Sequence, residues 1–212
     1  MKPFAACIAA ILLSIAFLQT SQAAEKHLIY IQGCCVESKD SPLAQDYHVI
    51  VKKLQDSGFD VFFELRTAEE ADGDAKVQAY AAKIAGYVRE LIKKGTAPED
   101  ITVSGFSQGS RTVLVASGLI ANPKVNYVLL AGCPYQGDHD VTIDYARVTG
   151  RVLSIVDNKD YIFDSCEGRL PNASQFREIF LDSGEGHKVF RLTDEAYLKL
   201  WMEPLENWAK GQ

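Results

Sequence analysis

Short apolar segments alternate along this chain with longer segments whose apolar residues recur at helical spacing. The apolar segments have the length of strands and lack the polar–apolar alternation of a sheet that is half exposed to water. Such strands are typical of parallel sheets buried on both faces, with helices as the covering layers. The pattern therefore predicts an α/β domain, a three-layer sandwich with a mostly parallel sheet of about six strands and helices on both faces.

Six segments are predicted to form strands, and helices are predicted between them. The predicted strands are residues 27–32, 59–65, 101–103, 125–131, 151–156 and 176–181. The predicted helices are residues 43–57, a long helix capped by Asp72 or Asp74 and ended by Gly95, a helix that runs to about Ala121, and residues 193–209. No internal repeat or linker interrupts this order, so residues 24–212 are predicted to form one domain.

Residues 1–23 have the features of a secretory signal peptide. Lys2 precedes an apolar run over residues 4–18, which is short for a membrane-spanning helix. Small residues follow where a signal peptidase needs them, and cleavage after Ala23 or after Ala24 fits equally well. A membrane anchor is the alternative. We expect an exported protein, periplasmic or secreted, with no membrane span after the signal is removed.

The composition argues against several other classes of protein. Hydrophobic residues make up 47% and charged residues 24% of the chain, which is typical of a globular protein rather than a disordered or fibrous one. The net charge is −6, and no basic run is longer than Lys52-Lys53 or Lys93-Lys94. Binding to a phosphate backbone needs a denser positive patch, so no nucleic-acid partner is expected.

One motif has a spacing that points to chemistry. The segment Gly105-Phe106-Ser107-Gln108-Gly109 lies between a predicted strand and a predicted helix. In that context Gly-x-Ser-x-Gly is typical of a nucleophile elbow, a sharp turn that exposes the serine hydroxyl at the carboxyl edge of the sheet. The free N–H groups at the start of the helix favour negative charge there. Ser107 is the candidate nucleophile, and a glycine-rich turn with a buried serine is the alternative.

A serine nucleophile needs a base, and the chain has four histidines. His27 opens the first predicted strand, at the wrong end of the sheet, and His48 lies on the first predicted helix. His139 lies in the loop after the fourth predicted strand and is poorly placed. His187 follows the last predicted strand in a glycine-rich loop, at the same edge as Ser107, so it is the predicted base.

A carboxylate between Ser107 and His187 in the chain is expected to orient the imidazole. Asp157 and Asp160 follow the strand that is predicted to end at residue 156, and Asp164 is a more distant candidate. The residues alone leave these alternatives open.

These features together resemble the α/β-hydrolase superfamily, close to its carboxylesterase and acyl-thioesterase branch, with cutinases as a near alternative. The resemblance rests on the elbow at residues 105–109, on Asp157-Asn158-Lys159-Asp160 after a strand, and on Gly184-Glu185-Gly186-His187. It covers the chain from the turn at residues 32–33 to the final helix. It implies Asp160 as the triad acid, because this branch places its catalytic aspartate after a short turn, and Asp157 would then cap that turn.

The resemblance implies a hydrolase of small-molecule carboxylic esters or thioesters, acting through an acyl-enzyme and needing no metal or other cofactor. Ser107, His187 and Asp160 would form the triad, and the backbone N–H groups of Gln108 and Cys34 would form the oxyanion hole. Many members have His-Gly where this chain has Gln32-Gly33. No insertion is long enough for a large lid. A non-catalytic binding protein with the same fold is the alternative, and no oligomeric state is predicted.

Four cysteines remain after the predicted signal peptide, namely Cys34, Cys35, Cys133 and Cys166. An even number in an oxidising compartment indicates disulfides, and four cysteines allow three complete pairings. The chain has no C-x-x-C spacing and no paired histidines, so a zinc site is not expected. The topology of the resembled family implies a Cys133–Cys166 bridge, which leaves Cys34 and Cys35 either free or bonded to each other.

Overall fold

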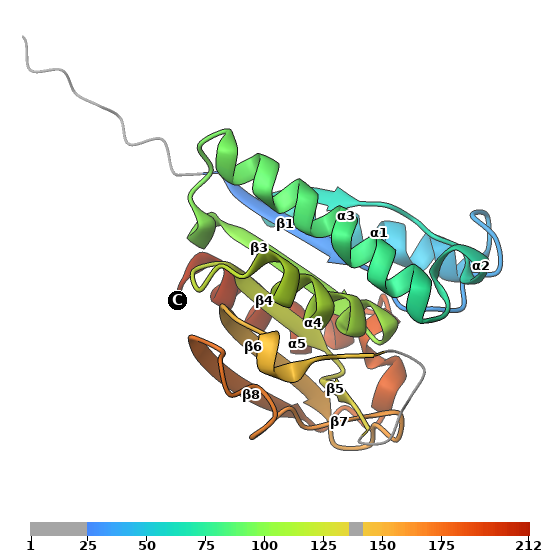
Figure 1. Cartoon of the computed structure of the whole chain (residues 1–212). Helices are drawn as coiled ribbons and strands as arrows, with labels where there is room; N and C mark the ends of the chain where they lie inside the picture. The colour runs from blue at the N-terminus through green and yellow to red at the C-terminus, as the bar shows by residue number, and fades with distance from the viewer. Residues whose placement is uncertain (1–24, 136–141) are drawn as a thin grey trace, which may run out of the picture.

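Six parallel strands form the central sheet of the computed structural model, which describes residues 25–135 and 142–212 (Figure 1). The strand order is β2–β1–β3–β4–β6–β8, and each neighbouring pair is parallel. The strands are β1 (Lys26–Ile31), β2 (Phe59–Phe63), β3 (Ile101–Phe106), β4 (Asn126–Leu130), β6 (Arg151–Asp157) and β8 (Gln175–Leu181). The predicted parallel sheet is confirmed. The predicted signal peptide and His139 lie outside the described residues.

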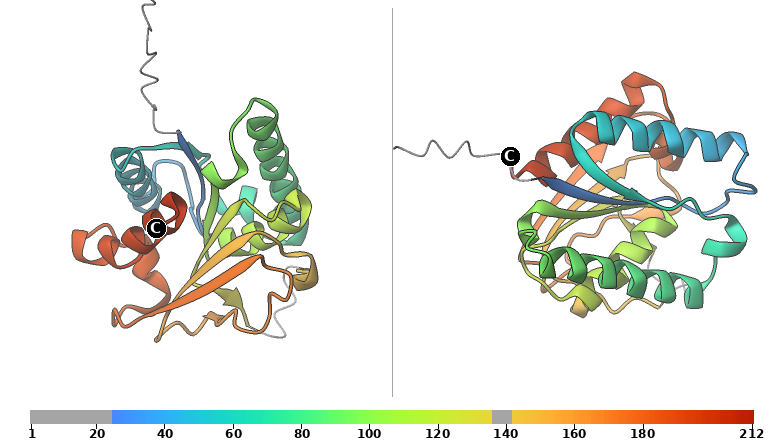
Figure 2. Two further views of the ribbon diagram at one scale, coloured as in Figure 1. Left: turned by 90° about the vertical axis from the view of Figure 1, so that its left-hand side faces the viewer. Right: turned by 90° about the horizontal axis from the view of Figure 1, so that it is seen from above.

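Helices cover the sheet on both faces, as predicted (Figure 2). One face carries α1 (Pro42–Asp56) and α5 (Glu195–Lys210), and the other carries α3 (Asp74–Lys93) and α4 (Gln108–Ile120). No helix of the described part of the chain is both long and apolar enough to cross a membrane.

Several short elements were not predicted from the sequence. They are α2 (Ala68–Ala71), the antiparallel pair β5 (Cys133–Pro134) and β7 (Phe163–Asp164), and the 3₁₀ helices η1 (Pro98–Asp100), η2 (Tyr145–Arg147) and η3 (Gly186–Arg191). Each has six residues or fewer, which is too short to show a period in the sequence. The prediction that Asp72 or Asp74 caps α3 is wrong, because the N-cap is Gly73.

Alternating side chains of the central strands enter two separate apolar layers. In β1, Leu28 and Tyr30 pack beneath α1 and α5, while Ile29 and Ile31 pack against α3 and α4. Because the central strands are buried on both faces, their sequences are mostly apolar. The expectation of full burial is wrong for β8, where Phe180 is 54% exposed, because β8 forms an edge of the sheet.

Both pairs of cysteines are bonded in the structure. The Cys133–Cys166 bridge implied by the family resemblance is confirmed, and both of its cysteines are fully buried. It joins β5 to the segment just after β7 and so links the two strands of this small antiparallel sheet, which are far apart in the chain. Cys34 and Cys35 form a disulfide between neighbouring residues.

Removal of the Cys133–Cys166 bridge in a Cys133→Ala/Cys166→Ala variant is expected to lower the free energy of unfolding by about 3 to 4 kcal/mol. The bridged residues are 33 positions apart, so the bridge removes considerable chain entropy from the unfolded state. Urea denaturation would measure the loss. A Cys34→Ala/Cys35→Ala variant is the matched control, and an equal loss in both variants would contradict this explanation, because neighbouring residues close almost no loop.

Candidate active site

Ser107 lies at the sharp turn between β3 and α4, in the position that the motif predicts. Its φ is +56°, in a region that residues with a side chain seldom adopt. A hydrogen bond to the neighbouring strand β4 stabilises the turn, since the Ser107 N–H donates to the Leu130 carbonyl at 3.0 Å. The Ser110 hydroxyl also lies 2.8 Å from the Gly105 carbonyl oxygen and 2.9 Å from that of Leu130. The surrounding backbone thus maintains the unusual conformation of the serine.

The two motif glycines are required by close contacts between backbone segments. A Cβ atom at Gly105 would overlap the carbonyl group of Gly109, and a Cβ atom at Gly109 would overlap the carbonyl oxygen of Ile31 at the end of β1. Without side chains at these two positions, α4 can begin directly against the sheet. The elbow therefore lies beside the loop that follows β1.

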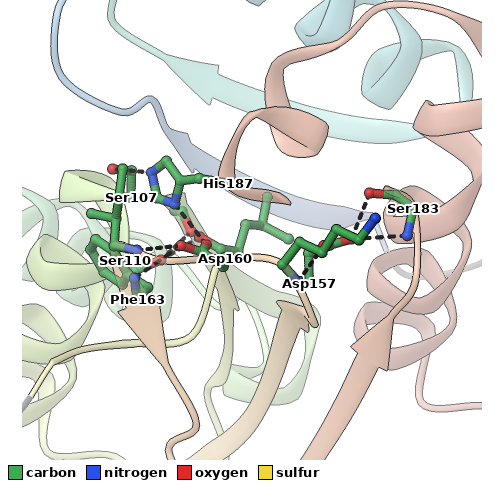
Figure 3. Close-up of polar contacts among 11 residues, drawn as sticks. Ser107, Ser110, Asp157, Asp160, Phe163, Ser183 and His187 are labelled. Atoms are coloured by element: carbon green, nitrogen blue, oxygen red, sulfur yellow. Dashed lines mark hydrogen bonds and ion pairs between the residues drawn. The ribbon is translucent and has the colours of Figure 1, made fainter. Parts of the chain in front are cut away.

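His187 connects Ser107 to Asp160 by two hydrogen bonds (Figure 3). The imidazole Nε2 is 2.9 Å from Ser107 Oγ, and Nδ1 is 2.7 Å from Asp160 Oδ2. A carboxylate only accepts, so Nδ1 carries the proton and Nε2 can accept from the serine hydroxyl. The three residues follow β3, β6 and β8, whose carboxyl ends lie at one edge of the parallel sheet.

The Asp160 carboxylate has a fixed orientation. Its side chain is 0% exposed, and Oδ1 accepts the backbone N–H groups of Ile162 at 2.8 Å and Phe163 at 3.0 Å. These bonds leave Oδ2 directed at the imidazole of His187. The turn after β6 therefore holds this acid in place before any substrate binds.

Asp157, the last residue of β6, has a different set of partners (Figure 3). Its Oδ1 accepts the Lys159 N–H at 2.9 Å, and its Oδ2 accepts the N–H of Ser183 at 3.0 Å and its hydroxyl at 2.5 Å. Burial opposes ionisation, but these hydrogen bonds outweigh it and hold the pKa of Asp157 below its usual value. Asp157 thereby ties the turn that carries Asp160 to the loop that carries His187. The more distant candidate, Asp164, accepts from the neighbouring Ser165 N–H instead.

Two phenylalanines enclose the His187 imidazole. The ring centroid of Phe106 lies 4.9 Å away, and Phe163 stacks at 5.4 Å with an interplanar angle of 28°. These contacts restrict rotation of the imidazole and shield its bond to Asp160. The sequence did not predict this role for either phenylalanine. Phe106 is inside the elbow motif, but no spacing in the sequence connects Phe163 to His187.

A cavity of about 520 Å³ opens over Ser107 and His187. Cys34 and Gln108, the two residues predicted to supply oxyanion donors, line this cavity. Neither backbone N–H donates a hydrogen bond to another residue of the described chain. Both groups are therefore available to a ligand. Other side chains that line the cavity are the charged Asp72, Arg111, Glu185, Lys188 and Arg191 and the exposed Tyr161 and Ile162.

The residues before Cys34 are held by buried polar contacts. The Gln32 side-chain amide donates to the Arg66 carbonyl at 2.7 Å and accepts the Arg66 N–H at 3.2 Å. The Gly33 N–H donates to the Tyr47 hydroxyl at 3.2 Å. Burial raises the pKa of Tyr47 to about 12, so this hydroxyl stays neutral. Gln32, at a position where many members of the resembled family have histidine, thus has a structural role that the sequence did not show.

Of the other histidines that the structure describes, neither His27 nor His48 lines the cavity over Ser107. His27 pairs with Asp60 at 2.7 Å at the start of β1, and His48 lies on α1 against Phe63. Within residues 25–135 and 142–212, no group of three or more His, Cys, Asp or Glu residues could hold a metal ion.

Comparisons with known proteins identify the fold. No family model and no curated protein matches the sequence. Among solved structures, SOBER1 from Arabidopsis thaliana aligns with a TM-score of 0.53 and 15% identity over 89% of this chain and 99% of its own. A dienelactone hydrolase from Anabaena variabilis aligns with a TM-score of 0.57 and 16% identity over 90% of this chain and 88% of its own. A phospholipase/carboxylesterase from Dyadobacter fermentans aligns with a TM-score of 0.52 and 14% identity over 84% of this chain and 88% of its own.

These structures align over at least 84% of this chain, and at such low sequence identity the likeness shows the fold alone. The chain has the α/β-hydrolase fold, as the family resemblance implied.

Proposed function

We propose that this protein is a serine hydrolase of small carboxylic esters or thioesters. The observation that carries the proposal is the hydrogen-bonded series from Ser107 through His187 to Asp160, located at an elbow and open to a cavity. Each member has the geometry that its role requires, and a protein that only binds a ligand does not need all three. The hydrolases among the solved structures with this fold support the same reaction class.

In the first half of the proposed reaction, the Ser107 hydroxyl oxygen attacks the acyl carbon while His187 Nε2 takes the hydroxyl proton. Asp160 stabilises the resulting imidazolium, and the N–H groups of Gln108 and Cys34 donate to the oxyanion. The tetrahedral intermediate collapses when His187 returns its proton to the leaving alcohol or thiol, which leaves an acyl group on Ser107.

In the second half, water replaces the alcohol or thiol. His187 removes a proton from the water as its oxygen attacks the acyl carbon, and the same oxyanion donors stabilise the second tetrahedral intermediate. Return of the proton to Ser107 releases the carboxylic acid. Apart from the substrate and one water molecule, the scheme uses only the side chains and backbone groups described above.

We further propose that the protein is exported, with residues 1–23 as a signal peptide and residues 24–212 as the hydrolase domain. The two disulfides support an oxidising compartment, periplasmic or extracellular, because such bonds are rare in reducing cytosol. Mass spectrometry of the protein from its native host would test this, with a mature N-terminus at Ala24 or Glu25 as the expected result. An intact N-terminus on cytosolic protein would contradict it.

A fluorophosphonate probe is expected to label Ser107 of the folded protein covalently. The reaction needs a nucleophile activated by its base, so it distinguishes a hydrolase from a binding protein with the same fold. Intact mass and peptide mapping would locate the label, and a heat-denatured sample is the control. Absence of labelling on correctly folded protein would favour the binding protein. A series of esters and thioesters of increasing acyl length would then define the substrate.

A further inference from the structure

We infer that the Cys34–Cys35 disulfide positions the backbone N–H of Cys34 as an oxyanion donor, so that ester turnover depends on the oxidation state of this pair. The inference rests on the proposed function, because it concerns the oxyanion hole of that reaction. It assigns a positioning role to a bond that would otherwise count as structural.

The backbone at the Cys34–Cys35 disulfide has an unusual conformation. Cys35 has a φ of +74°, in the left-handed region that a residue with a side chain rarely adopts. The bond between neighbouring side chains closes a small ring that contains the Cys34–Cys35 peptide bond, and this ring restricts the torsions on either side. Without the ring, Cys35 is expected to relax toward negative φ, which would turn the backbone around Cys34.

Hydrogen bonds anchor both ends of the oxyanion loop, defined as residues 32–36. Gln32 and Gly33 are held by Arg66 and Tyr47, as described above. At the other end, the Val36 carbonyl accepts the Ala68 N–H at 2.8 Å.

Between these anchors, the backbone groups of Cys34 and Cys35 make no hydrogen bond with any other residue in the described ranges. The disulfide is therefore the restraint at the point where the donor lies. Its loss would free the donor while leaving both ends of the oxyanion loop in place.

The Cys34–Cys35 disulfide lies at the wall of the cavity over Ser107. Cys34 and Cys35 both line the cavity over Ser107, and Cys35 is exposed while Cys34 is half-buried. Cys133 and Cys166, in contrast, are fully buried. A dithiol reductant can therefore reach the first pair under conditions that spare the second. It would transfer two electrons and two protons to the disulfide, giving two cysteine thiols and the oxidised, cyclic form of the reductant.

The experiment compares p-nitrophenyl butyrate hydrolysis by the oxidised protein before and after dithiothreitol treatment. Alkylation and peptide mapping would select conditions in which only Cys34 and Cys35 are thiols. We expect kcat to fall by about 10- to 100-fold, since complete loss of one oxyanion donor lowers kcat by about 100- to 1000-fold. KM and the melting temperature should change little, and reoxidation should restore kcat.

A Cys34→Ser/Cys35→Ser variant provides the matched test without reductant. It should have the low kcat of the reduced protein and should not respond to dithiothreitol. Affinity for a trifluoromethyl ketone should fall by the same factor as kcat/KM, because its hemiketal oxyanion occupies the oxyanion hole. A loss of stability of the whole fold would instead lower the melting temperature. It would not lower inhibitor affinity and kcat/KM by the same factor.

The outcomes separate this inference from the proposed function. If the oxidised wild-type protein neither hydrolyses esters nor reacts with a fluorophosphonate, the proposed function fails. If it does both, and the reduced protein and the double variant keep the wild-type kcat, the inference about the disulfide is wrong.

Discussion

Replacement of Ser107 by alanine is expected to lower kcat for ester hydrolysis by about 10⁶-fold, leaving only the rate that binding and the oxyanion donors supply. The hydroxyl is the nucleophile, and in the structure it contacts Nε2 of His187. The backbone N–H of residue 107 would still donate to the Leu130 carbonyl, so the elbow should persist. The variant should therefore be folded but inactive.

The measurement is p-nitrophenyl ester hydrolysis at high enzyme concentration, together with the melting temperature. Ser117→Ala is the matched control, because Ser117 is a buried serine on the same helix that bonds the Thr149 backbone and does not line the cavity. It should lose some stability and keep its kcat. A Ser107→Ala protein that retained half of the wild-type activity would rule out the proposed mechanism.

The second large effect is expected for Asp160→Asn, with a loss of about 10⁴-fold in kcat. The N–H groups of Ile162 and Phe163 would keep an oxygen of the new amide at the Oδ1 position. The amide NH₂ would then face His187 and donate to Nδ1. This favours the tautomer with its proton on Nε2, which cannot accept the Ser107 proton. Turnover would fall while the fold remained intact.

Asp157→Asn is the matched control, with the same chemical change three residues earlier. Both Asp157 oxygens accept hydrogen bonds from backbone N–H groups, so an amide NH₂ would leave a buried donor without an acceptor. We expect a loss of about 1 to 3 kcal/mol in the free energy of unfolding. Activity should fall much less than in Asp160→Asn. An Asp157→Asn protein that is well folded but inactive would move the catalytic role to Asp157.

The stability effect of Asp157 should also depend on pH. Its pKa is below the usual value in the folded state, so the ionised side chain stabilises the fold at every pH above the unfolded-state pKa of about 3.9. That contribution is lost as the pH falls through the lower, folded-state pKa. Urea denaturation of wild type and Asp157→Asn should show a full stability difference at pH 7 that shrinks below about pH 4. A constant difference would contradict this assignment.

Much of the fold was predictable because it depends on local periodicity. Buried strands and amphipathic helices each leave a regular apolar pattern, and the structure has every predicted strand and helix within a few residues. The short elements α2, β5 and β7 leave no such pattern. The exposure of β8 was not predictable either, since a strand becomes an edge only through the order of the whole sheet.

For the candidate site, the sequence by itself determined the residues that depend on near neighbours. The elbow at Ser107 follows from two glycines and a strand–helix junction, and His187 follows from a parallel sheet whose strand ends share one edge. A family resemblance was needed to prefer Asp160 over Asp157, because two carboxylates in one turn look alike in the sequence.

Only the tertiary structure decided how these residues are held. The backbone donors of Ile162 and Phe163 direct Asp160 at the imidazole, and Phe163 stacks on that imidazole from a distant segment. Gln32 binds the backbone of Arg66, which is 34 positions away, and so anchors the start of the oxyanion loop. These contacts form when remote segments meet at the carboxyl edge of the sheet. Their geometry depends on the path of the whole chain, and no local pattern encodes it.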